Sequence, residues 1–157
     1  MIIHQILGNR HELSDQQLAG LTQDHVTLST EQLRKRVQRL TTHTGREIGL
    51  QLATTQELRD GDILFRDDDT LITVQVAPTD VLVIAPEDLT SMGFVAHSLG
   101  NRHLQAQFFG PESEYGRAVM VVRYDHTVED FLTEHHIPFT REQRVMPAAF
   151  RHAEHTH

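Results

Sequence analysis

The sequence contains no cysteine, which excludes disulfide bonds, thiolate zinc sites and iron–sulfur clusters. It also lacks any apolar run near the roughly 18 residues that a membrane-spanning helix needs, and its N-terminus lacks the pattern of a signal peptide. We therefore expect a cytoplasmic protein with no membrane partner. Positive charge is scarce as well: 14 Lys and Arg against 22 Asp and Glu give a net charge of −8. We expect no nucleic-acid partner, because such binding needs positive charge to displace counterions from phosphates.

Histidine, in contrast, is abundant: the 157 residues include 12 histidines. Imidazole is the commonest protein ligand for borderline divalent metals. Because thiolates are absent, any transition-metal site in this chain must be built from histidine, carboxylate and water.

Residues 1–76 predict a β-rich domain with one short helix. The helix is expected within residues 29–40, where Ser29 and Gln32 have the spacing of a capping box. Leu33, Val37 and Leu40 then form an apolar stripe at helical spacing. The expected strands, separated in part by acidic turns, are residues 1–7, 24–28, 46–53, 61–65 and 71–77.

Residues 77–146 predict a second domain with the element order β-α-β-β-α-β of the ferredoxin-like split unit. The run Val81–Ile84 indicates a strand buried on both faces, and helical spacing follows with Gly100 as the expected stop. Two strands, a helix that Pro138 ends and a last strand near 138–146 complete the order. The predicted fold class is therefore α+β.

Residues 147–157 have no apolar periodicity, and we predict a flexible tail there. His155 and His157 are close enough for one flexible segment to chelate a metal, with His152 nearby. A random polar terminus is the alternative. Because a flexible tail cannot preorganise a site, its metal affinity should be modest unless a second element supplies ligands.

The tetrapeptide Gly-Asn-Arg-His occurs twice, at residues 8–11 and 100–103. In the second copy we expect Gly100 to end a helix and His103 to begin a strand, so that His103 projects from a rigid corner. In the first copy His11 follows a short strand and enters a polar stretch. We predict that the copies are not an internal repeat and that His11 is an ordinary loop residue.

Two other histidine-containing stretches have simple structural interpretations. Asp125 is expected to cap the second helix of its domain, which would leave His126 exposed in the first turn. His135 and His136 do not face each other on a helix, so we expect both at the surface. His97 lies outside the apolar stripe of its own helix and should also be exposed.

The stretch HSLGNRHLQAQF, which begins at His97, resembles the UreE family of urease accessory proteins, the metallochaperones that deliver nickel during urease maturation. Other stretches are similar to the family in the same order. They are REIGLQL at 46–52, DGDIL at 60–64, VLVIAP at 81–86, RYDHTVEDFL at 123–132 and the histidine-bearing tail. The resemblance covers nearly the whole chain.

The resemblance implies an N-terminal domain likened to peptide-binding chaperone modules and a ferredoxin-like domain that binds metal and forms a homodimer. In the family the histidine of the second tetrapeptide faces its twin across the dimer axis and binds nickel, so that role falls on His103. The tail histidines 152, 155 and 157 would complete the metal shell. Some members bind metal at a His-Asp-His cluster, of which this chain retains Asp125 and His126 but has Tyr124 in place of the first histidine.

The resemblance further implies Ni(II) as cargo, with Zn(II) or Cu(II) able to substitute in vitro. The implied partners are the urease accessory GTPase and the wider urease assembly complex. We expect no enzyme activity, because the chain lacks a phosphate-binding loop and the His-Glu-x-x-His and Gly-x-Ser-x-Gly signatures. A peptide-binding or scaffolding module and a metal-dependent hydrolase are the competing hypotheses, and nickel titration distinguishes among the three.

Overall fold

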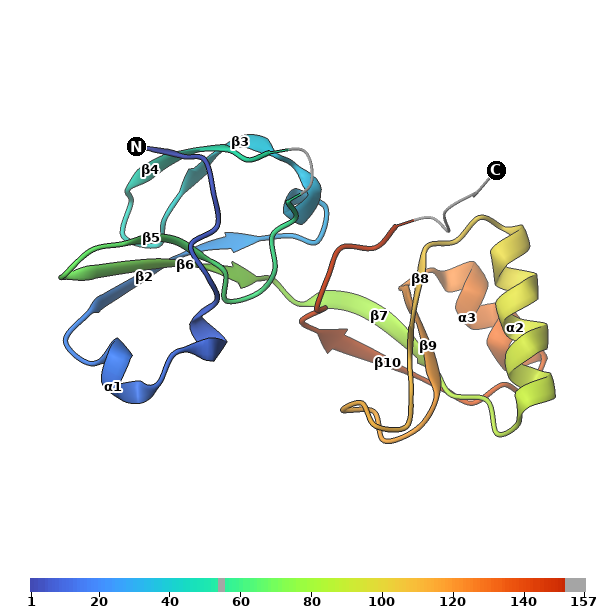
Figure 1. Ribbon diagram of the computed structural model, residues 1–157. Helices are drawn as coiled ribbons and strands as arrows, with labels where there is room; N and C mark the ends of the chain where they lie inside the picture. Colours follow the sequence, from blue (N-terminus) through green and yellow to red (C-terminus); the bar gives the residue numbers. More distant parts are fainter. Residues whose placement is uncertain (54–55, 152–157) are drawn as a thin grey trace. The chain divides into compact units, whose positions relative to one another are not determined.

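The computed structural model describes residues 1–53 and 56–151, and the chain forms two compact units. Unit 1 comprises residues 1–78 and 145–149, and unit 2 comprises residues 79–144 and continues from Phe150. Strands outnumber helices among the described residues, and the fold class is mixed α+β, as the sequence predicts (Figure 1). No helix within the described ranges is long and apolar enough to cross a membrane.

Unit 1 contains two three-stranded sheets, with strand orders β1-β4-β3 and β2-β6-β5. Strands β3 and β4 form an antiparallel hairpin, whereas β1 pairs with β4 and β2 pairs with β6 in parallel. The core of the unit is a cluster of buried aliphatic side chains from both sheets. The strands are β1 (Ile2–Ile3), β2 (Thr22–Leu28), β3 (Val37–Thr41), β4 (Glu47–Gln51), β5 (Ile63–Arg66) and β6 (Thr70–Val76).

The helix predicted within residues 29–40 is wrong in extent. The capping hydrogen bonds between Ser29 and Gln32 are present, but they start only a single 3₁₀ turn, η2 (Gln32–Arg34). The chain then enters β3, whose Val37 is 69% exposed while Leu40 is buried. The apolar spacing of this stretch therefore fits a strand with one covered face. The only α-helix among the described residues of unit 1 is the short α1 (Asp15–Leu18), which no prediction included.

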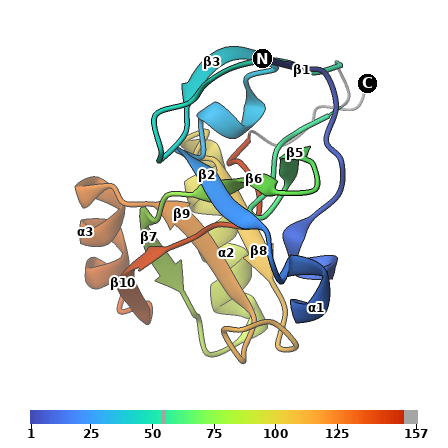
Figure 2. The same cartoon turned by 90° about the vertical axis from the view of Figure 1, so that its left-hand side faces the viewer.

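Unit 2 has the predicted element order β-α-β-β-α-β. Its four strands pair antiparallel in the order β10-β7-β9-β8, and α2 and α3 pack against one face of this sheet through a shared core (Figure 2). The run Val81–Ile84 is buried throughout, as predicted. The elements are β7 (Thr79–Ile84), α2 (Leu89–Asn101), β8 (Ala106–Phe109), β9 (Val119–Arg123), α3 (His126–Glu134) and β10 (Phe139–Arg144).

The stretch after β10 differs from the flexible tail expected from residue 147. Ala149 is buried in the core of unit 1, and Phe150 is 1% exposed, with the Arg123 guanidinium 5.2 Å from the centre of its ring. Met146, just before this segment, is buried as well, so the segment is packed although it has no apolar periodicity. The expected tail residues from 152 onward lie outside the described residues.

Candidate functional site

Helix α2 ends at Asn101, with Arg102 as its C-cap, and so extends one residue beyond Gly100, where the sequence placed its end. The backbone N–H of His103 donates to the Gly100 carbonyl (3.0 Å) and that of Leu104 donates to the Leu99 carbonyl (3.4 Å). This is the hydrogen-bond pattern of a Schellman motif. Such a motif requires a left-handed backbone at the first residue after the C-cap of the helix. His103 is that residue, with φ 58°. Glycine is the usual choice at such a position because it has no Cβ.

The imidazole of His103 is exposed, as predicted, but its backbone is held on both sides. Leu99 is fully buried in the core of unit 2, and the half-buried Leu104 packs against the same core. His103 therefore projects from a rigid corner formed by a helix end. Strand β8 begins only three residues later, at Ala106.

Beside His103 lies a shallow hollow of about 250 Å³, and Asp125, another candidate ligand, also lines it. Asp125 comes from the start of α3, so the hollow joins the end of one helix to the beginning of the next. The complete lining is His103, Leu104, Gln105, Val122, Arg123, Tyr124 and Asp125. His103 and Asp125, which are 22 positions apart in the sequence, thus lie on one surface.

Asp125 is the N-cap of α3, as predicted. Its Oδ1 accepts hydrogen bonds from the Thr127 backbone (2.8 Å), the Thr127 hydroxyl (2.5 Å) and the Val128 backbone (3.4 Å). These bonds, led by that of the Thr127 side chain, hold the pKa of Asp125 below its ordinary value. The carboxylate is therefore ionised at neutral pH, and none of these bonds uses Oδ2. His126 is exposed in the first turn of the helix.

Tyr124 stands where the His-Asp-His cluster of the resemblance would begin, and its environment is that of a structural residue. Its hydroxyl donates to Glu129 (3.2 Å), and the Arg141 guanidinium lies 3.5 Å from the centre of its ring. Burial and the Glu129 carboxylate raise the pKa of Tyr124, so the phenol stays protonated at neutral pH. A protonated phenol is a poor metal ligand, which leaves Asp125 and His126 as the candidates in this stretch.

No three histidine, aspartate or glutamate side chains come together to hold a metal within residues 1–53 and 56–151. His103, Asp125 and His126 are described, whereas the tail candidates His152, His155 and His157 lie outside the described residues. One copy of the described chain thus offers His103 and its neighbours as an incomplete ligand set.

A second histidine has the backbone conformation of His103. His136 follows α3 with φ 55°, and its N–H and that of Ile137 donate to Thr133 and Leu132 in the same Schellman pattern. His135 and His136 are exposed, as predicted, and His135 also contacts the rings of Phe94 and Phe131. The left-handed histidine is therefore not by itself a mark of the site. His103 differs from His136 in lining the hollow that Asp125 also lines.

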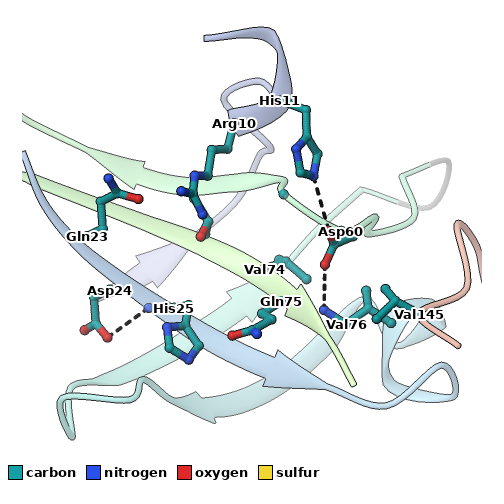
Figure 3. Close-up of a pocket in the computed structure, with 12 residues that line it drawn as sticks. Arg10, His11, Gln23, Asp24, His25, Asp60, Val74, Gln75, Val76 and Val145 are labelled. Atoms are coloured by element: carbon teal, nitrogen blue, oxygen red, sulfur yellow. Dashed lines mark hydrogen bonds and ion pairs between the residues drawn. The ribbon is translucent and has the colours of Figure 1, made fainter. Parts of the chain in front are cut away.

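The first Gly-Asn-Arg-His copy has a different structure, and its side chains hold a turn of unit 1 in place. Asn9 donates from Nδ2 to the Asp60 carbonyl (2.9 Å) and to Asp62 Oδ1 (3.1 Å), and its Oδ1 accepts the His11 backbone N–H (2.9 Å). His11 Nε2 lies 3.2 Å from Asp60 Oδ2, and Asp60 Oδ1 accepts the N–H of Val76 (Figure 3). The tetrapeptide therefore fastens the N-terminal segment to the 60–62 turn.

His11 also lines a polar hollow of about 390 Å³ on unit 1, together with Arg10, Gln23 and His25 (Figure 3). The imidazole of His25 stacks on that of His43, with ring centres 4.9 Å apart. No pattern in the sequence relates these two histidines, which are 18 positions apart. Their proximity depends on a contact between β2 and the β3–β4 turn, which local patterns do not encode.

Comparison with known proteins gives a consistent family. The family model described as "UreE urease accessory protein, N-terminal domain" matches residues 3–77. Proteins called urease accessory protein UreE from Corynebacterium urealyticum, Pseudarthrobacter chlorophenolicus and an Arthrobacter species are 60%, 58% and 56% identical to this chain. Each alignment covers 100% of both sequences.

Proposed function

The chain belongs to the UreE family of urease accessory proteins, and from this membership we propose that it is a nickel-binding metallochaperone that delivers Ni(II) for assembly of the urease active site. It handles the ion as cargo and catalyses no reaction. Zn(II) and Cu(II) bind in its place in vitro, because imidazole suits all three ions. It acts in the cytoplasm, and its partners are the urease accessory GTPase and the urease assembly complex.

The principal ligand in this proposal is His103. The observation that carries the assignment is the exposed imidazole at φ 58°, beside a hollow lined by the ionised Asp125. A side chain at this left-handed position costs about 1 kcal/mol relative to glycine. The imidazole is exposed and lies outside the described core of unit 2, and metal ligation supplies a reason for a histidine at this corner.

Completion of the metal shell requires ligands beyond one copy of the described chain. We propose that unit 2, as a ferredoxin-like domain, forms a homodimer that brings two His103 imidazoles to one shared site. Its antiparallel sheet order β10-β7-β9-β8 supports that fold. His152, His155 and His157 from the tail complete the shell, with Asp125 and His126 as nearby secondary ligands. Nitrogen and oxygen ligands of this kind suit Ni(II).

A partly open, shared site is suited to transport. Solvent and tail groups that complete the shell are easily displaced, so a better chelating partner can remove the ion. A symmetric dimer also presents each residue twice, so one substitution at the axis removes two ligands. These properties distinguish a carrier from a hydrolase, which needs a rigid site beside a general base.

The experiment compares two glycine substitutions at matched positions. His103→Gly and His136→Gly each relieve the left-handed backbone, so each should leave thermal stability unchanged or raise it by about 1 kcal/mol. Nickel calorimetry on the full chain should then separate them. We expect His103→Gly to lose the tightest nickel site and His136→Gly to keep it.

Urease activation at limiting nickel provides the functional readout for the same pair. His103→Gly should fail to support activation, and excess nickel should restore it by mass action. Retention of one tight nickel per dimer in His103→Gly would refute the assignment. Equal loss in both variants would show that helix ends in general, not this site, determine binding.

A further inference from the structure

Strand β3 lies at the edge of its sheet, and among the described residues it pairs with β4 alone (Figure 1). The hydrogen bonds from Leu52 N–H to the Arg36 carbonyl (2.9 Å) and from Thr42 N–H to the Arg46 carbonyl (2.8 Å) fix its register with β4. In an antiparallel pair, alternate residues direct both backbone polar groups away from the partner. Val37, Arg39 and Thr41 therefore present N–H and C=O groups along the open edge, and no described residue bonds to these groups.

The side chains of these same residues border a hollow of about 450 Å³ on the outer face of the sheet. Arg39 pairs across the sheet with Gly49, which in turn pairs with Ile2, so the centre of the hollow has no side chain to fill it. Met1, Ile2 and Val37 lie along the hollow and are 51%, 57% and 69% exposed. An open strand edge beside a hollow that exposed apolar side chains border is the arrangement that accepts an added strand.

Charge indicates which kind of strand this edge accepts. Arg34, Lys35, Arg36 and Arg39 are all exposed within six residues of a chain whose net charge is −8. None of these four side chains takes part in an ion pair with another described residue. A second copy of the chain would bring the same cations against them, and such charges oppose pairing between edge strands of identical copies.

We propose that the β3 edge binds an extended acidic segment of a partner protein as a fourth strand of the β1-β4-β3 sheet. The backbone of the partner pairs with Val37, Arg39 and Thr41. Its carboxylates lie near Arg36 and Arg39, and an apolar side chain enters the hollow beside Val37 and Ile2. Glu47 pairs with Thr41 and is exposed, so its negative charge would repel an acidic side chain at that end of β3. The acidic part of the segment therefore lies toward the Arg36 end.

The test uses the full chain and a fluorescein-labelled ten-residue peptide whose odd positions are glutamate in one half and valine in the other, with threonine at the even positions. Glutamate and valine then occupy one face of the added strand. Fluorescence anisotropy should show saturable binding of this peptide and none of the matched peptide with lysine in place of glutamate. Arg39→Glu should weaken binding by about tenfold or more, since it places like charges together. Arg66→Glu, an equal charge change at an exposed position on the other sheet, should leave binding unchanged.

Hydrogen exchange locates the bound peptide. The amides of Val37, Arg39 and Thr41 should exchange fast in the free protein and become protected in the complex. Val37→Pro removes one of these donors without breaking a bond to β4, and it should abolish binding while circular dichroism stays unchanged. Absence of binding, equal binding of both peptides, full affinity in Arg39→Glu, or protection confined to other amides would each overturn the proposal. Nickel stoichiometry should be the same with and without peptide, which separates this result from the test of His103.

Discussion

At the scale of residues, one tetrapeptide performs two unrelated tasks. In the first copy Asn9 binds across the 60–62 turn, and the contact is tight. Gly61 has φ 85°, and a Cβ there would lie 2.6 Å from Cδ2 of His11 and 2.8 Å from Oδ1 of Asn9. Only glycine fits against this loop. In the second copy the asparagine is the last residue of α2, and His103 is the left-handed residue that follows the C-cap.

Substitutions in the first copy should therefore change stability and not metal binding. Asn9→Ala removes two side-chain donors and one acceptor at a partly buried turn, so it should lower the free energy of unfolding by about 1–2 kcal/mol. His11→Ala removes only an exposed contact and should have a smaller effect. Urea denaturation measures both, and calorimetry should find nickel binding unchanged in each. A nickel loss in His11→Ala as large as that in His103→Gly would contradict this division of tasks.

At the scale of elements, Asp24 joins the two sheets of unit 1. It lies on β2 and is buried, and its Oδ2 accepts the Thr44 hydroxyl (2.6 Å) from the β3–β4 turn. The backbone N–H groups of His25 (2.8 Å) and Thr44 (3.2 Å) donate to Oδ1. Burial alone would raise the pKa of Asp24, but hydrogen bonds from Thr42, Thr44 and the backbone outweigh it and lower the pKa from 3.8 to about 2.

This lowered pKa makes the stability of unit 1 dependent on pH. Because the folded pKa lies below the unfolded value, the ionised carboxylate contributes stability above about pH 4 that is lost as pH falls toward 2. The shift corresponds to about 2 kcal/mol. Asp24→Asn should cost about that much at neutral pH, and the difference from the parent chain should shrink between pH 4 and pH 2 in urea denaturation. Asp68→Asn, at an exposed turn, is the control and should cost little. A difference that stays constant with pH would argue against an ionised Asp24.

At the scale of the whole molecule, the chain is still folded after its last strand, and residues 145–149 belong to unit 1. Met146, Ala149 and Phe150 are all buried, so residues 145–150 belong to the folded protein. The proposed ligands of the tail begin only at His152. We therefore expect residues up to about 151 to contribute to folding and the residues after them to contribute to metal binding.

Two truncations test this boundary. Deletion of residues 152–157 should leave the fold and the oligomeric state intact and should lower nickel affinity or stoichiometry. Deletion of residues 148–157 also removes Phe150 and should destabilise the protein by about 3–5 kcal/mol. Phe150→Ala in the full-length chain should reproduce that destabilisation while it keeps the nickel ligands. Thermal unfolding by circular dichroism and nickel calorimetry give the two readouts. Equal stability of the two truncated chains would refute the packing assigned to Phe150.

Local patterns were sufficient where an element is defined by its own residues. The alternating and continuous apolar runs predicted most strands of both units to within a few residues. There are two exceptions: the first predicted strand is reduced to Ile2–Ile3, and β3 was predicted as part of a helix. Asp125 was correctly assigned as a helix cap, because its hydrogen bonds reach only two and three residues along the chain. The family resemblance rested on the same kind of local signal, and the comparisons confirm it.

Tertiary contacts decided the rest. Residues 29–40 carry a capping box and helical spacing, yet pairing with β4 makes Val37–Thr41 a strand, since a ladder of backbone bonds outweighs weak helix propensity. The sequence alone identified His103 as a candidate ligand and placed it at a helix corner. Only the fold brings Asp125 to the same hollow and places Asn9 across the 60–62 turn, because contacts between distant residues depend on how the elements pack and not on the spacing within any one of them.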